Sequence, residues 1–160
     1  NGVLAALVAI TGSCAFVAPW AAVVIGAVAG IVTFFTAQWV EKMRIDDPIY
    51  AFSVHGVAGM WGAVSTGLFA TPALVEITGV GRPGLFYGGG FTQLGVQVLG
   101  VVGTFIFVVV VTAVILGAIK AAVGIRVTEE EETMGLDLSE HGTYGYPEHM
   151  KMISDSEKRM

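Results

Sequence analysis

His55 is the residue of this 160-residue chain whose chemistry stands out. It lies seven residues after Pro48, within a run, residues 48–75, that contains no Asp, Glu, Lys or Arg. An imidazole can accept or donate a hydrogen bond and can relay a proton. Ionisable groups inside apolar spans usually face a bundle interior or a cavity and take part in moving ions, protons or substrates. We therefore interpret His55 as a candidate transport residue.

Three glycines, Gly56, Gly59 and Gly62, follow His55 closely. On an α-helix, Gly59 and Gly62 share the face of the histidine. They either leave open space above the imidazole or let another helix approach closely, and the spacing fits both alternatives. The structural alternative for His55 itself is a packed, neutral imidazole that is hydrogen-bonded to a backbone carbonyl of a neighbouring helix.

The residues around His55 do not predict a metal or cofactor site. Zinc usually takes three or four protein ligands, and no second histidine or carboxylate shares the span. The single Cys14 has no partner cysteine for a disulfide or a thiolate site. The glycines at 79, 81 and 84 match a dinucleotide-binding string, but no βαβ unit supports it, so we interpret them as a loop. We expect no metal and no cofactor.

The composition indicates a membrane protein. Hydrophobic residues make up 54% of the chain and charged residues 13%, with a mean hydropathy of +0.76. Residues 1–40, 48–75 and 83–119 carry no charged side chain, and each run is longer than the ~20 residues that cross a bilayer. We predict an all-α, polytopic membrane helical bundle. The net charge of −5 excludes a basic nucleic-acid-binding surface, so we expect no nucleic-acid partner.

The first two helices are predicted from apolar runs and breakers. Residues 1–11 are typical of the closing turns of a hydrophobic helix, and because this run starts at the first residue we expect a fragment that begins inside a membrane helix. A second helix is expected from Pro19 to about Val40, with Gly26 and Gly30 in a G-x-x-x-G spacing that favours close helix packing.

The third span is predicted to begin at Asp47 and Pro48 and to run to about Ala70. Asp47 can cap the amides of the first turn, and Pro48 suits the first helical position. Residues 71–87 are expected to form a loop. Residues 88–119 would then form a helix of about 48 Å, which must tilt, bend or wrap around the outside of the bundle.

The charged residues predict the orientation and the tail. Lys42 and Arg44 lie at one side of the membrane and Arg82 at the other, which places the C-terminal tail in the cytoplasm. Thr128 and Glu131 fit a capping box that would open a short helix over the acidic run. The alternative is a solvated charge run without a helix. The last dozen residues are expected to be disordered.

A stretch around His55 closely resembles the ammonium transporter (Amt/Mep/Rh) family. It covers residues 46–62, DDPIYAFSVHGVAGMWG, and continues in the Gly-Leu-Phe-Ala of residues 67–70. The resemblance implies the C-terminal portion of an eleven-helix inverted-repeat transporter. Residues 1–126 would then hold the end of helix eight and helices nine to eleven, and residues 127–160 the cytoplasmic tail. It also extends to residues 7–11, 124–127, 135–137 and 141–142.

The resemblance implies site residues and partners as well. His55 matches the second histidine of the family's twin-histidine pair, and Asp47 matches the acidic residue at the start of the same helix, where a structural role is favoured over substrate contact. Family members are homotrimers of the plasma membrane, and PII-type signalling proteins dock on their cytoplasmic face. The remaining positions are a pore lining of Leu4, Thr11 and Ala51, helix packing at Gly26, Gly30, Gly56, Gly59 and Gly62, and a regulatory tail at Gly135, Leu136, Asp137, His141 and Gly142.

The function predicted from these residues is passage of ammonium or ammonia through an apolar pore in the lipid bilayer, with His55 in a proton relay. The chain is not expected to be an enzyme. An ammonium sensor that uses the same membrane fold is the main alternative. A subunit of a proton-pumping enzyme is disfavoured, because that class needs further carboxylates or lysines along the spans.

Overall fold

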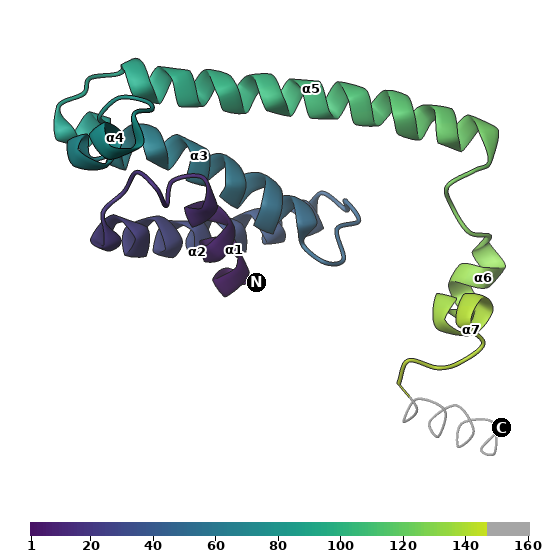
Figure 1. The fold of residues 1–160 in the computed structure, drawn as a ribbon. Helices are drawn as coiled ribbons and strands as arrows, with labels where there is room; N and C mark the ends of the chain where they lie inside the picture. The colour runs from purple at the N-terminus through teal and green to yellow at the C-terminus, as the bar shows by residue number, and fades with distance from the viewer. Residues whose placement is uncertain (147–160) are drawn as a thin grey trace. The chain divides into compact units, whose positions relative to one another are not determined.

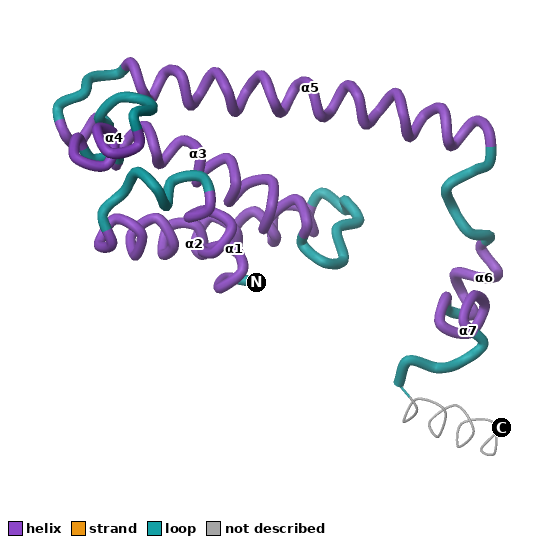
Figure 2. The backbone as a smooth tube through the Cα atoms, viewed as in Figure 1, coloured by secondary structure: helices purple, strands orange, loops and turns teal. Residues whose placement is uncertain are grey.

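The computed structural model describes residues 1–146, in which helices joined by loops form the whole architecture (Figures 1 and 2). The chain divides into one compact unit, Asn1–Val110, and a second that begins at Val111. Among the described residues the one extended pairing is an isolated antiparallel bridge between Val17 and Ala70. The elements are α1 (Gly2–Thr11), α2 (Pro19–Lys42), η1 (Phe52–Val57), α3 (Ala58–Phe69), α4 (Pro72–Thr78), η2 (Leu85–Tyr87), α5 (Thr92–Ala122), α6 (Glu129–Met134) and α7 (Leu136–His141).

The helix α2 begins at the predicted residue. Pro19 occupies the first helical position, where the missing N–H has no intrahelical partner to lose. The buried residues of α2 include Ala21, Ile25, Ala29 and Thr33, which recur every four residues and form one stripe. Ala21, Ile25 and Ala29 belong to one buried cluster with residues of α1, η1 and α3. These three elements all contact α2, and α1, α2 and α3 lie together in Figure 1. Burial of small and branched side chains along one face therefore holds the first unit together.

Helix α1 crosses both α2 and α3 at glycine positions. A β-carbon placed on Gly26 would lie 3.2 Å from the Ala6 β-carbon. A β-carbon on Gly62 would collide with the backbone carbonyl of Ala9. The small residues of α2 and α3 thus allow α1 to approach closely, as small residues do at helix crossings in lipid.

The third predicted span begins later than expected and is not a uniform α-helix. Residues 48–49 form a turn and Tyr50 has φ +57°, so Pro48 is not the first helical residue. Asp47 nevertheless caps the span, because its carboxylate accepts the amide hydrogens of Ala51 at 2.7 Å and Phe52 at 3.1 Å. A wider π-turn, η1, then precedes α3, which ends at Phe69.

The prediction of an uninterrupted loop over residues 71–87 is wrong. Helix α4 lies inside it, with the Thr71 hydroxyl accepting the Leu74 amide at 3.3 Å and Pro72 at the first helical position. Gly79 ends α4 in the left-handed conformation that glycine adopts without a steric penalty. The glycine-rich stretch that follows is a loop, as expected.

Helix α5 begins at Thr92, four residues later than predicted, because Gly88 and Gly90 have positive φ and keep the chain in turns. Of the residues of α5, Gln93 alone is buried, and its side-chain oxygen accepts the Arg82 amide at 2.9 Å. Both α2 and α5 are long and apolar enough to cross a bilayer. Among the described residues, only these two helices are long enough by themselves. The third predicted span consists of two consecutive elements, η1 and α3.

The tail forms two short helices. The capping box at the start of α6 is confirmed, since the Thr128 hydroxyl accepts the Glu131 amide and the Glu131 carboxylate accepts the Thr128 amide. The interpretation of the acidic run as a mere solvated charge run is therefore wrong. Helix α7 was not predicted. The last dozen residues, expected to be disordered, lie outside the described part of the chain.

We predict that Gly62→Ala destabilises the first unit. The added methyl group meets the Ala9 backbone, which cannot move away as a side chain can, and overpacking of this kind costs about 1–3 kcal/mol. The matched control is Gly103→Ala in α5, where a β-carbon would meet nothing within 4 Å. Thermal unfolding in detergent should give a lower midpoint for Gly62→Ala alone. Equal midpoints for the two variants would contradict the close crossing of α1 and α3.

Candidate functional site

His55 lies inside the π-turn η1, at the N-terminal end of the third span. Its two predecessors, Ser53 and Val54, are buried at 0% and 2% exposure, whereas His55 is exposed. Within residues 1–146 the imidazole makes no hydrogen bond, so the alternative of an imidazole bonded to a neighbouring carbonyl is not met there. His55 is therefore exposed and without a hydrogen-bond partner among residues 1–146. π-turns occur often at functional sites.

Of the two alternatives for the glycines after His55, the close approach of another helix is met at Gly62, and the space beside Gly59 does not border His55. Gly62 admits the backbone of α1, as described above. Gly59 has more room, because a β-carbon there would lie 3.8 Å from the nearest atom, on Val8. The side chain of Phe52 covers Gly56, with a ring carbon 3.3 Å from a β-carbon built there.

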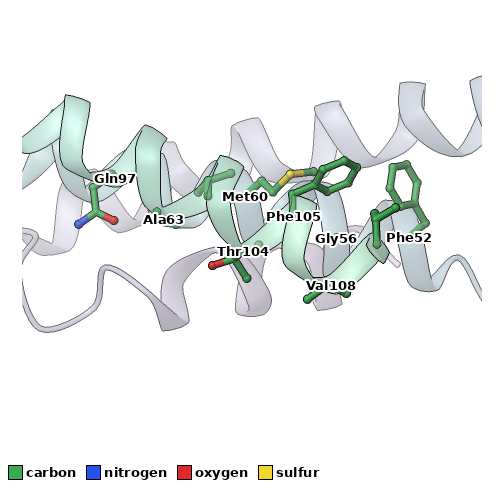
Figure 3. Close-up of a pocket in the computed structure, with 12 residues that line it drawn as sticks. Phe52, Gly56, Met60, Ala63, Gln97, Thr104, Phe105 and Val108 are labelled. Atoms are coloured by element: carbon green, nitrogen blue, oxygen red, sulfur yellow. The ribbon is translucent and has the colours of Figure 1, made fainter. Parts of the chain in front are cut away.

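A cavity of about 600 Å³ lies between α5 and the span formed by η1 and α3. Phe52 lies near one end of it and Gln97 near the other (Figure 3). Its lining is mainly apolar, with Gln97 and Thr104 as the polar side chains. Gly56 and Gly59 border this cavity and His55 does not, so the histidine and the cavity belong to different faces of the span.

The acidic residue before the span acts on the backbone. Asp47 accepts two amides at the start of the helical segment, those of Ala51 and Phe52. The first amides of a helix have no acceptor within the helix, and lipid offers none. The carboxylate of Asp47 supplies an acceptor, which is the structural role favoured from the sequence.

A second interaction closes the same connection between α2 and η1. The Tyr50 hydroxyl donates a hydrogen bond to the Glu41 carboxylate at 2.9 Å. This hydrogen bond, together with the negative charge of Glu41, raises the pKa of Tyr50 above its usual value. The hydroxyl therefore stays protonated and keeps donating throughout the physiological pH range.

The three residues expected to line the pore are all exposed in the described chain. Leu4 has 53% of its surface exposed, and the Thr11 hydroxyl donates to the Val8 carbonyl of its own helix at 2.6 Å. Ala51 begins the helical part of the third span. Leu4 and Thr11 lie on α1, whereas Ala51 lies at the start of the third span, close in sequence to His55. All four residues belong to the first unit.

The tail residues named from the sequence organise the end of α7. Gly135 joins α6 to α7 with φ +95°, and Gly142 ends α7 in the left-handed conformation. The Asp137 carboxylate accepts the Gly145 amide at 3.1 Å, and its backbone carbonyl accepts the Thr143 amide at 3.3 Å. Leu136 and His141 are the first and last residues of α7, and both are exposed.

Two polar residues near the site were missed in the sequence. Thr33 on α2 donates to the Ser53 carbonyl at 3.3 Å, and the Trp61 indole on α3 donates to the Ile25 carbonyl of α2 at 3.0 Å. The available signal was the four-residue spacing that places Thr33 in line with Ala21, Ile25 and Ala29. A threonine in such a buried stripe needs a hydrogen-bond partner.

Comparison with known proteins shows the family to which this chain belongs. The family model described as "Ammonium Transporter Family" matches residues 1–146. The chain belongs to the ammonium transporter family. Its membership agrees with the resemblance found around His55, and it makes the chain part of a membrane protein.

Curated members of the ammonium transporter family share about two fifths of the matched residues. The "Ammonium transporter" of Bacillus subtilis is 40% identical over 94% of this chain and 36% of the relative. That of Aquifex aeolicus is 43% identical over 91% of this chain and 33% of the relative. The chain therefore spans about a third of the length of these curated relatives.

Solved structures in the ammonium transporter family have the same helical arrangement. The structure named "Sensor Amt Protein" aligns with a TM-score of 0.74 at 35% identity, over 87% of this chain and 33% of its own. Mep2 of Saccharomyces cerevisiae aligns with a TM-score of 0.72 at 31% identity, over 79% of this chain and 29% of its own. The all-α membrane bundle predicted from the sequence is confirmed.

We predict that Asp47→Ala destabilises the start of the third span. It leaves the amides of Ala51 and Phe52 without their acceptors, and loss of such a cap costs about 0.5–2 kcal/mol. Asp46→Ala is the control, because Asp46 is exposed and makes no hydrogen bond within residues 1–146. Denaturant titration in detergent should separate the two variants. An Asp46 variant that is as unstable as the Asp47 variant would refute the capping role.

We predict that Thr128→Val raises the pKa of Glu131. The Thr128 amide and then its hydroxyl hold the pKa of this carboxyl below the ordinary value of 4.5. The stabilisation of α6 is therefore complete above 4.5 and is lost as the pH falls through the lower, folded value. Carboxyl ¹³C titration by NMR should show the rise in Thr128→Val. Thr133→Val, which loses only a bond to the Glu129 carbonyl, should leave the Glu131 pKa unchanged.

Proposed function

We propose that this chain forms the C-terminal third of an ammonium transporter and supplies an imidazole relay at His55. The observation that carries the proposal is the place of this histidine. It is an exposed histidine in a π-turn, at the start of an apolar span of a chain that belongs to the ammonium transporter family.

The physical basis is the energy needed to dehydrate an ion. A bare ammonium ion in a low-dielectric passage loses its hydration energy, whereas neutral ammonia does not. An imidazole nitrogen can accept a hydrogen bond from the substrate, take up its proton and return it. His55 would be the second of two histidines in this relay. Asp47 would fix the start of the helix that carries it.

The proposed assembly follows the family resemblance. The complete protein would be a homotrimer in the plasma membrane with one pore per subunit, and Leu4, Thr11 and Ala51 would line that pore. Residues 1–126 would be the membrane part, and residues 127–160 a cytoplasmic tail. The bend between α6 and α7 at Gly135 and the loop held by Asp137 support the tail as a regulatory segment, at which a PII-type protein would dock.

An ammonium sensor is the second candidate function. It is favoured by the likeness to the structure named "Sensor Amt Protein", at 35% identity. The gene that encodes this chain distinguishes the two candidates. A reading frame that continues beyond Met160 into a kinase-like or cyclase-like domain would identify a sensor.

We predict that His55→Ala in the full-length protein abolishes methylammonium uptake, because no other group at this position can pass the proton. His149→Ala, which removes a histidine outside the candidate site, is the control and should retain uptake. Radiolabelled methylammonium uptake, corrected for the amount of protein in the membrane, measures both. Uptake by His55→Ala at the wild-type rate would overturn the proposal.

A further inference from the structure

The π-turn that carries His55 is bonded to α2 through a buried side chain. The Thr33 hydroxyl donates to the Ser53 carbonyl oxygen at 3.3 Å, and Thr33 is 3% exposed. The Ala58 amide, five residues further on, is shared between this oxygen and the His55 carbonyl, and its bond to Ser53 is the hydrogen bond of a π-turn. A carbonyl oxygen has two lone pairs and can accept both donors. Thr33 therefore bonds a carbonyl oxygen that also accepts a hydrogen bond of the π-turn.

The direction of this hydrogen bond is unusual for a helical threonine. Such a hydroxyl commonly bonds a carbonyl of its own helix, three or four residues back. Thr36, one turn away on α2, does so with the Val32 carbonyl at 2.8 Å. Thr33 instead donates to another element. It shares the buried stripe of α2 with Ile25, whose carbonyl receives the Trp61 indole, so α2 is bonded to the third span at two levels.

The two residues before His55 are held against α2 by burial and by the hydrogen bond from Thr33. Ser53 and Val54 are buried, and the exposed His55 follows directly. Successive side chains of an α-helix point about 100° apart, and the extra residue of a π-turn changes which side chains share a face. The direction of the imidazole therefore depends on whether the π-turn is kept.

The bond from α2 depends on the backbone of Ser53 and not on its side chain. The Ser53 hydroxyl is buried and has no hydrogen-bond partner in the part of the chain that the structure describes. An alanine at position 53, which is no larger than the buried serine, would present the same carbonyl to Thr33. Removing the serine hydroxyl should therefore leave the turn intact, since an unpaired buried hydroxyl does not stabilise the fold.

We propose that Thr33 is a positioning residue for His55. Its hydroxyl holds the Ser53 carbonyl and keeps the π-turn in the form that directs the imidazole into the ammonium path. This role rests on the proposed function of His55. Misplacement of a working group by about 1 Å can lower a rate by about 100-fold, so a distant hydroxyl can control transport without contact with the substrate.

The first test measures the turn itself in the full-length transporter. Thr33→Val keeps the shape of the side chain and removes the donor, so amide hydrogen exchange over residues 54–58 should become about fivefold faster. Thr33→Ser should restore the slow exchange. Thr36→Val and Ser53→Ala are matched controls that should exchange as the wild type does. Equal exchange in Thr33→Val and Thr36→Val would overturn the proposal.

The second test measures transport by the same variants, per folded trimer recovered by gel filtration. Thr33→Val should lower kcat for methylammonium uptake by about tenfold or more with KM unchanged, and Thr33→Ser should recover most of it. Faster exchange with an unchanged kcat would overturn the positioning role. His55→Ala is measured alongside. Full uptake by that variant would overturn the proposed function, and with it the positioning role, while the exchange experiment would still report on the bond from Thr33.

Discussion

The hydrocarbon of a membrane offers no hydrogen bonds, so each backbone polar group of a helix that crosses it must be satisfied within the protein. This constraint governs the third span. Its first free amides are taken by the Asp47 carboxylate, and a carbonyl oxygen that accepts a hydrogen bond of its π-turn is also bonded by Thr33. The small residues of α1, α2 and α3 then bring the helices close enough for these bonds to form. Of the polar side chains of η1, Ser53 is buried and His55 is exposed.

The elements with strong local signals could be predicted from the sequence. Pro19 begins α2 because its ring fits the first helical position, and Thr128 and Glu131 form the capping box that their spacing indicates. The family could be identified from the residues around His55. Helix α4 carries the usual signals of a helix start and end at Thr71, Pro72 and Gly79, but its 7 residues are too few to show the periodicity that indicates a helix.

The geometry of the site could not be predicted, since it depends on contacts between distant parts of the chain. The π-turn has no sequence signature in an apolar span, and the left-handed Tyr50 moves the helix start beyond Pro48. Whether a glycine admits a helix or borders a cavity depends on what lies opposite, and Gly62 and Gly59 differ in this respect. The pairing of Thr33 with Ser53 joins residues 20 positions apart.

The most direct test of the account is the structure of the full-length protein in a lipid nanodisc, determined by electron cryomicroscopy. We expect the His55 imidazole to face a narrow apolar passage through each subunit, with the π-turn retained and the Thr33 hydroxyl within hydrogen-bonding distance of the Ser53 carbonyl. A ring directed toward the acyl chains, or enclosed by side chains with no opening beside it, would exclude His55 from the ammonium path.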